Sequence, residues 1–352
     1  MQLGWAGVEL FYVISGFLIT RILLRSREGP GYLRTFYLRR GLRILPIYWL
    51  ASIVAIGITA VSMGSGALGF LPFYFFYVQN YYPQLASAFT AGIPDLAHTW
   101  TLAIEEQFYW LWPLALLLVS GKRLLGLLAL LFVSAAFARL ALLESTGNPF
   151  AVIATLPSQA DGLAAGAALA VLVHQGIRQT VLRRMGLAAV AIGAVSTLAL
   201  GLRAGLPAFA LTSVWASDPV NVFMLSSLAV LFVGLVALTI TSTGPLVRVL
   251  SVAPLRWSGK ISYGLYLYDP FAILTVRMGA HLMGFDDAGG PTRFLTAAAH
   301  FAVVYAFALL SWRYIEAPFI RLKSRVSPEV SRQAVRVDVP VAVIDSHGWP
   351  AG

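Results

Sequence analysis

Residues 98–120 have the sequence HTWTLAIEEQFYWLWPLALLLVS. The stretch is long and apolar enough to cross a bilayer as one helix, since the hydrocarbon core requires about 20 such residues. It nevertheless begins with His98 and contains two adjacent acids, Glu105 and Glu106. Ionisable side chains inside a membrane are costly, so they indicate a function by default. The stretch therefore predicts a membrane-spanning helix that carries part of a functional site.

The rest of the chain extends this prediction to a polytopic membrane protein. Of the 352 residues, 59% are hydrophobic and 11% are charged, whereas soluble domains carry about 25% charged residues. The mean hydropathy is +0.78. Nine stretches meet or approach the length of a span, namely 3–24, 44–61, 98–120, 123–143, 157–173, 186–202, 220–242, 258–278 and 294–316. We predict an all-α fold, a polytopic transmembrane helix bundle with about nine spans.

Two further segments are not assigned as spans. Residues 68–79 are apolar but few and include Pro72, so we interpret them as a re-entrant or interfacial segment. Residues 326–352 are polar and rich in Val and Pro. They are predicted to be a disordered cytoplasmic tail that follows a transmembrane domain at 1–325.

The distribution of Lys and Arg predicts the orientation in the membrane. All but four of the 25 basic residues lie on one side of the predicted spans. The four exceptions are Arg139, Arg203, Arg277 and Arg293. The basic side is cytoplasmic by the positive-inside rule, so we expect a multi-pass plasma membrane protein with its N-terminus outside and its C-terminus inside. These clusters also account for the net charge of +10, so no nucleic acid partner is expected.

Single-cysteine labelling tests this orientation, because the chain contains no cysteine. A cysteine introduced at Ser87 should react with a membrane-impermeant reagent in intact cells, and one at Gln179 should not. The reverse labelling pattern would overturn the orientation. The lack of cysteine also excludes thiolate metal sites and a cysteine nucleophile, and no metal site is predicted.

Three residues of the 98–120 stretch are candidates for catalysis. His98, Glu105 and Trp112 are spaced by seven residues, so they share one face of a continuous helix. A carboxylate beside an imidazole can act on a hydroxyl as a general base with an orienting partner. Alternatively, His98 is an interfacial residue and the aromatic residues belong to the core. The adjacent acids are harder to place without a function, so the catalytic candidates are His98, Glu105 and Glu106.

Other polar residues also lie within or at the ends of predicted spans. They are Glu9, Asp161, Tyr263, Asp269 and Glu316. Ionisable side chains at such positions commonly line polar pathways or pair with one another inside a bundle. We regard all five as candidates for functional use.

The segment YLRTFYLRRGLRILP at 32–46 is basic and aromatic. Its simplest interpretation is an amphipathic interfacial helix whose charges set the topology. Alternatively, it is an anion site: Arg40 and Arg43 are three residues apart and therefore share a helix face, where guanidinium groups can hold phosphates. Arg39 is adjacent to them.

Small residues predict two close helix contacts. Ser15-Gly16 lies inside the first span, and SGKISYG at 258–264 contains two glycines near the start of the eighth. Small side chains let helix backbones approach each other in membranes. Pro270, which follows Asp269, is expected to kink its helix.

Six segments, taken in this order, resemble the acyltransferase 3 family of membrane acyltransferases. They are GVELFYVISGFLIT (7–20), FYLRRGLRILPIYW (36–49), HTWTLAIEEQFYWLWP (98–113), PSQADGLAAGAALA (157–170), SGKISYGLYLYDPF (258–271) and YIEAPFIRL (314–322). The resemblance implies a bundle of about ten helices. It also implies a cytoplasmic acyl-CoA, usually acetyl-CoA, as donor substrate without a tightly bound cofactor. The acceptors that it implies are glycans, lipid-linked sugars or macrolides.

Two departures from the family pattern affect the expected activity. The family normally opens with one more helix, which carries an Arg and a His regarded as catalytic, and the resemblance in this chain begins just after that helix. The family also often has a His where this chain has Asp269. We therefore expect the 352-residue form to have little or no acyltransferase activity, and a form extended upstream to be active.

Together these features predict an O-acyltransferase. Acyl-CoA would dock at Arg39, Arg40 and Arg43, and its acyl group would meet an acceptor hydroxyl near Glu105 and Glu106, with Asp161 also considered. A transporter or flippase that uses the buried carboxylates is the main alternative. A third interpretation is an inactive, truncated family member with a binding or scaffolding role.

Overall fold

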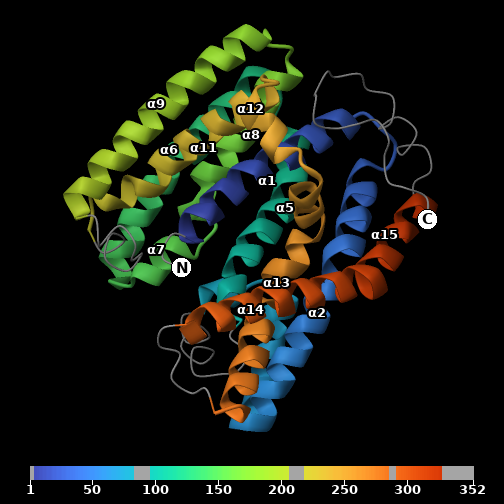
Figure 1. The fold of residues 1–352 in the computed structure, drawn as a ribbon. Helices are drawn as coiled ribbons and strands as arrows, with labels where there is room; N and C mark the ends of the chain where they lie inside the picture. Colours follow the sequence, from blue (N-terminus) through green and yellow to red (C-terminus); the bar gives the residue numbers. More distant parts are fainter. Residues whose placement is uncertain (1–3, 83–95, 206–217, 285–290, 327–352) are drawn as a thin grey trace. The chain divides into compact units, whose positions relative to one another are not determined.

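The computed structural model describes residues 4–82, 96–205, 218–284 and 291–326, and these residues contain helices and no strand. The long helices (Figure 1) are α1 (Gly4–Ser26), α2 (Tyr32–Met63), α5 (Trp100–Leu118), α6 (Gly121–Thr146), α8 (Ala160–His174), α9 (Gln179–Ala204), α11 (Met224–Ile240), α13 (Ala253–Leu282) and α14 (Pro291–Ser311). Shorter ones are α3 (Leu71–Phe75), α7 (Pro149–Ile153), α12 (Pro245–Leu250) and α15 (Ala317–Val326). A π-helical turn, η7 (Trp312–Glu316), joins α14 to α15.

Each of the nine predicted spans overlaps a helix, which confirms the all-α membrane helix bundle. Within the described residues, five helical runs are long and apolar enough to cross a membrane on their own. They are Gly4–Ser26, Tyr32–Ser62, Gly121–Thr146, Gln179–Ala204 and Arg293–Leu322. The number of crossings remains a prediction. The segment 68–79 forms only short helical turns around α3, none of which is long enough to span.

The helices fall into two compact units. Among the described residues, the first unit comprises α1, the helices from α5 to α11 and nearly all of α12, up to Val249. The second comprises nearly all of α2, with α3, α13, α14, η7 and α15. The predicted tail at 326–352 lies almost entirely outside the described residues, as does Ser87.

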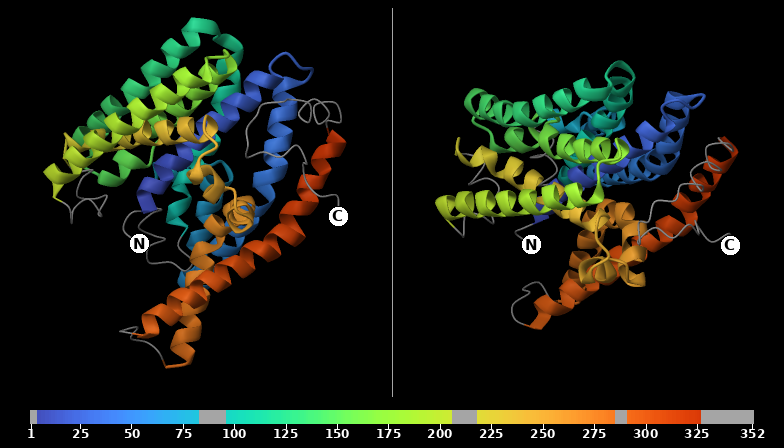
Figure 2. Two further views of the ribbon diagram at one scale, coloured as in Figure 1. Left: turned by 45° about the horizontal axis from the view of Figure 1, so that its top comes forward. Right: turned by 90° about the horizontal axis from the view of Figure 1, so that it is seen from above.

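In the first unit, α8 packs against α1, α6 and α11, and α9 runs alongside α11. The two views of Figure 2 show α9 (yellow-green) and α11 (yellow) side by side. The contact between α1 and α8 depends on glycines. A Cβ on Gly16 would collide with the carbonyl oxygen of Leu163, and one on Gly166 would collide with the carbonyl oxygen of Val13. The predicted close contact at Ser15-Gly16 is confirmed.

In the second unit, α2 differs from the expected arrangement of an interfacial segment followed by a separate span. Residues 32–46 and 44–61 form one helix that continues through Pro46.

The glycines of α13 differ in how closely a neighbouring helix approaches them. A Cβ on Gly264 would lie 3.3 Å from the Cβ of Ala308 on α14, whereas Gly259 has open space around it. Of these two glycines, only Gly264 therefore makes the predicted close contact.

Candidate functional site

Glu105 lies on α5 at the centre of a buried hydrogen-bonded cluster in the first unit. Its carboxylate Oε1 accepts hydrogen bonds from the hydroxyls of Ser15 on α1 and Tyr109 on α5. The two hydroxyl oxygens are themselves 2.7 Å apart. Glu105 is 4% exposed and Tyr109 is 1% exposed. The cluster places an oriented carboxylate inside the helix bundle, as proton transfer from a hydroxyl would require.

The helical face predicted to link His98, Glu105 and Trp112 is only partly present. Glu105 and Trp112 lie on α5, where the indole of Trp112 donates a hydrogen bond to Thr20 Oγ1 at 2.7 Å. His98 belongs to a separate 3-10 turn, η3 (Ala97–Thr99), because α5 begins at Trp100. The seven-residue spacing assumed one continuous α-helix from His98, and α5 does not include His98. Glu106 is buried on α5 next to Glu105.

His98 is held instead by Tyr266 of α13, in the second unit. Its Nε2 lies 3.1 Å from the carbonyl oxygen of Tyr266, and the Tyr266 hydroxyl donates to the carbonyl of His98 at 2.6 Å. A carbonyl oxygen only accepts hydrogen bonds, so Nε2 carries the proton and Nδ1 is the basic nitrogen of the neutral ring.

Asp161, at the start of α8, forms a buried ion pair that the sequence did not reveal. Arg139 of α6 donates to Asp161 Oδ2 at 2.8 Å, and both side chains are 0% exposed. The same guanidinium donates to the carbonyl of Ser158 at 2.5 Å and to Ser226 Oγ at 2.6 Å. The Ser226 hydroxyl in turn donates to Asp161 at 2.6 Å. We interpret Asp161 as a residue that joins α6, α8 and α11 rather than one that meets a substrate.

This ion pair shows that Arg139 is a buried residue of a helix, whereas the charge count had placed it among the basic residues of the outer side. Arg139 lies within α6, inside the stretch 123–143 that was itself predicted as a span. A buried Arg in a span requires a partner just as a buried acid does. The free-energy cost of burying Arg139 in a span could therefore have predicted, from the sequence, that it pairs with an acid.

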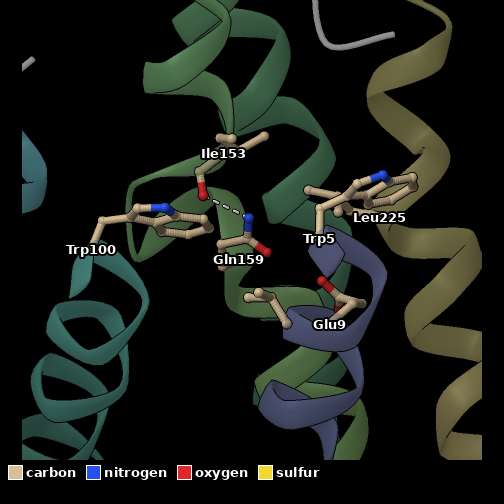
Figure 3. Close-up of a pocket in the computed structure, with 7 residues that line it drawn as sticks. Trp5, Glu9, Trp100, Ile153, Gln159 and Leu225 are labelled. Carbon is tan, nitrogen blue, oxygen red and sulfur yellow. Dashed lines mark hydrogen bonds between the residues drawn. The ribbon is translucent and has the colours of Figure 1, made fainter. Parts of the chain in front are cut away.

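Glu9 of α1 faces a small pocket in the same unit, with a cavity volume of about 20 Å³, which is room for about one water molecule. The pocket is lined chiefly by Trp5, Glu9, Trp100, Ile153, Gln159 and Leu225 (Figure 3). Glu9 is 1% exposed, and neither of its carboxylate oxygens accepts a hydrogen bond from the described residues. Gln159, which the sequence did not single out, donates its amide nitrogen to the carbonyl of Ile153 at 2.6 Å.

The candidate donor-binding arginines lie on α2 in the second unit. Arg39, Arg40 and Arg43 belong to the N-terminal half of this helix and are half-buried or exposed. Arg43 attracts Glu316 electrostatically, and Glu316 is buried in the π-helical turn η7. Any phosphate at Arg43 would therefore share this guanidinium with a buried acid of the protein itself.

Asp269 also has a neighbour that the sequence did not identify. His300 Nε2 of α14 lies 3.0 Å from Asp269 Oδ1, within ion-pair range but without the alignment of a hydrogen bond. Tyr263 is half-buried six residues earlier on α13. Within the described ranges, no group of three His, Asp or Glu residues is arranged to hold a metal ion.

The chain was also compared with known proteins. Residues 2–313 match the family model described as an acyltransferase domain, the acyltransferase 3 family. A peptidoglycan O-acetyltransferase from Listeria monocytogenes is 30% identical over 335 residues, which cover 90% of this chain and 51% of that protein. A putative peptidoglycan O-acetyltransferase from Bacillus subtilis is 29% identical and covers 90% of this chain and 50% of its own length.

A putative O-acetyltransferase from Staphylococcus aureus is 32% identical over 138 residues, 34% of this chain and 22% of that protein. The chain thus spans about half the length of the curated relatives that it matches over most of its residues. No solved structure matches the chain.

Proposed function

Because the chain belongs to the acyltransferase 3 family, we propose that it transfers an acetyl group from cytoplasmic acetyl-CoA to a hydroxyl of a glycan at the outer face of the membrane. The relatives that match it along 90% of its length carry the name of peptidoglycan O-acetyltransferases, which favours peptidoglycan as the acceptor. A lipid-linked sugar or a macrolide is the alternative acceptor class. The family membership favours this function over the transporter or flippase.

The observation that carries the proposal is the buried carboxylate of Glu105, which Ser15 and Tyr109 orient. Transfer forms a bond between the hydroxyl oxygen and the acyl carbon while the thioester C–S bond breaks. The hydroxyl proton must leave as the new bond forms, and the departing thiolate finally takes up a proton. We assign the proton-accepting role to Glu105. His98 and Glu106 remain further catalytic candidates.

The proposal is tested by expressing the chain, alone and with its upstream in-frame residues, in a host that does not acetylate its peptidoglycan. Membranes are supplied with radiolabelled acetyl-CoA, and ester-linked label is measured in purified peptidoglycan after mild alkaline release. Transfer by either form supports the function. Transfer by the 352-residue form would also contradict the expectation that this form has low activity. Label in neither form, with both proteins inserted, would contradict the function.

The arginines of α2 give a prediction for the donor. Replacing both Arg40 and Arg43 with Gln is expected to weaken acetyl-CoA binding, because each charge-assisted bond to a phosphate contributes about 1.5–3 kcal/mol. Binding is measured by equilibrium dialysis of labelled acetyl-CoA against detergent-solubilised protein. Arg34→Gln, on the same helix but outside the proposed set, is the control. Unchanged affinity in the double variant would assign these arginines to topology alone.

A further inference from the structure

The second unit contains a buried acid within an irregular helical turn. Glu316 is 4% exposed and lies in η7, the π-helical turn through which α14 continues into α15 (Figure 1). A π-helical turn interrupts the regular hydrogen bonding of a helix and occurs frequently at functional sites. A buried acid at the end of a predicted span is costly as well. Both costs fall on Glu316, which indicates that the position of its carboxylate has a function.

Groups from α13 and α14 hold this carboxylate in place. Ser311, the last residue of α14, is a hydrogen-bonding neighbour of Glu316. The Tyr268 hydroxyl of α13 donates to Ser311 Oγ at 3.2 Å, so the Ser311 hydroxyl keeps its own proton for the carboxylate. A Cβ on Gly264 would lie 3.4 Å from Glu316 Oε1. The acid therefore lies against α13, and its orientation is set by the protein itself.

Arg43 of α2 is a cation that acts on this acid. It attracts Glu316 electrostatically, although Arg43 is exposed and Glu316 is buried. Both residues and the groups that hold the acid belong to the second unit. A guanidinium carries several N–H donors in a rigid plane and can hold a carboxylate and a phosphate at the same time. A fixed acid beside Arg43 therefore restricts the positions that its guanidinium occupies.

This restriction affects how strongly an anion binds. A long side chain loses rotamer freedom when it binds a ligand, and a side chain that is already held loses less, so the ligand binds more tightly. The alternative is that the carboxylate competes with the phosphate for the guanidinium. The exposures favour positioning, because the acid approaches Arg43 from the buried side whereas a phosphate arrives from the exposed side.

We propose that Glu316 is a positioning residue that holds Arg43 in place for the phosphates of the acyl-CoA donor. This inference rests on the proposed function, and it gives a role to a buried acid that the transfer step does not use. Glu316 itself does not contact the donor in this scheme. The charge distribution predicts that Arg43 and the end of α14 lie at the cytoplasmic side, from which acyl-CoA arrives.

The first test replaces Glu316 with Gln, which keeps the size of the side chain and removes its charge. Binding of labelled acetyl-CoA is measured by equilibrium dialysis with detergent-solubilised protein, and affinity is expected to fall about tenfold because Arg43 is no longer held. In the active form, the KM for acetyl-CoA should rise similarly, while kcat and the acceptor KM stay close to wild type. Glu316→Asp, which retains the charge, should keep more affinity than Glu316→Gln.

A double-mutant cycle shows whether the effect passes through Arg43. Arg43→Gln alone should weaken acetyl-CoA binding. Adding Glu316→Gln to it should change affinity by less than about twofold, because no guanidinium remains to be positioned. A general loosening of the fold would instead reduce affinity in both backgrounds. Ser311→Ala leaves both charges in place but removes a neighbour that orients the acid, so a smaller loss than in Glu316→Gln is expected.

The matched control is Glu28→Gln. Glu28 is an exposed acid a few residues before α2, on the same predicted side of the membrane. Its replacement removes the same charge as Glu316→Gln without changing the surroundings of η7. Acetyl-CoA affinity should therefore remain at the wild-type value. A change as large as that in Glu316→Gln would indicate a general effect of charge and would overturn the positioning role.

The outcomes separate this inference from the proposed function. Acetyl transfer by the wild type, with unchanged acetyl-CoA affinity in Glu316→Gln, would overturn the inference while the function stands. Tighter binding by Glu316→Gln would indicate competition and would overturn it as well. A Glu316 effect that requires Arg43, without transfer to glycan by any form, would support the inference and contradict the function. No acetyl-CoA binding by folded wild-type protein would overturn the inference, and the transfer assay would decide the function separately.

Discussion

Replacing Glu105 with Gln is expected to reduce acetyl transfer by about 10²–10⁴-fold, the usual contribution of a positioned general base. The amide has nearly the same shape as the carboxylate but cannot take a proton. Because the hydroxyls of Ser15 and Tyr109 both donate to Glu105, the surrounding helices already orient the acid. The measurement is the rate of label transfer from acetyl-CoA to peptidoglycan in membranes that contain whichever form of the chain is active.

Two variants serve as controls for this prediction. Tyr109→Phe removes one of the donors to Glu105 but retains the acid, so a smaller loss of rate is expected than in Glu105→Gln. Glu106→Gln tests the adjacent acid, which is equally buried. If Glu105→Gln retained the wild-type rate while Glu106→Gln abolished transfer, the proton-accepting role would belong to Glu106.

Replacing Arg139 with Leu is expected to destabilise the protein by about 3–5 kcal/mol, because it leaves the carboxylate of Asp161 buried without its counter-ion. The two side chains are both 0% exposed and 2.8 Å apart. The loss should appear as a lower midpoint of denaturant-induced unfolding in detergent.

A double variant distinguishes the ion pair from general packing. Replacing both Arg139 and Asp161 with Leu removes both buried charges, and much of the lost stability should return. The matched control is Arg203→Leu, which breaks a pair with Asp218 at a similar distance of 2.9 Å but with 47% and 35% exposure. Such an exposed pair contributes about 0–1 kcal/mol. Equal losses in Arg139→Leu and Arg203→Leu would contradict the assigned role of Arg139.

The sequence predicted those residues of the candidate site whose charge interrupts an apolar stretch. Glu9 and Glu105 stand out in this way, because an acid inside an apolar stretch of span length is costly to bury and is readily recognised in the sequence. Their partners did not stand out. Ser15 attracted attention as a small residue for packing, and its hydrogen bond to Glu105 joins residues 90 positions apart. Gln159 is uncharged, and nothing in its neighbours along the chain shows that it lines the pocket beside Glu9.

His98 shows the limit of reasoning from spacing. Seven residues separate it from Glu105, but the shared face requires a continuous helix, and α5 begins only at Trp100. His98 belongs to η3 instead, where it contacts Tyr266 of α13. The same limit applies to α2, where a proline and a change of polarity suggested a boundary but the helix continues.

The sequence by itself determined the all-α membrane bundle and the approximate position of each helix, because apolar length and backbone hydrogen bonding leave a membrane chain few alternatives. It also singled out the acids that are buried, Glu9, Glu105, Glu106, Asp161 and Glu316, together with Asp269, whose side chain is 43% exposed. Only the tertiary structure decided which of those acids are neutralised, as Asp161 is by Arg139, and which face a pocket, as Glu9 does. The physical reason is that burial follows from local composition, whereas pairing depends on which side chains from distant helices meet in space.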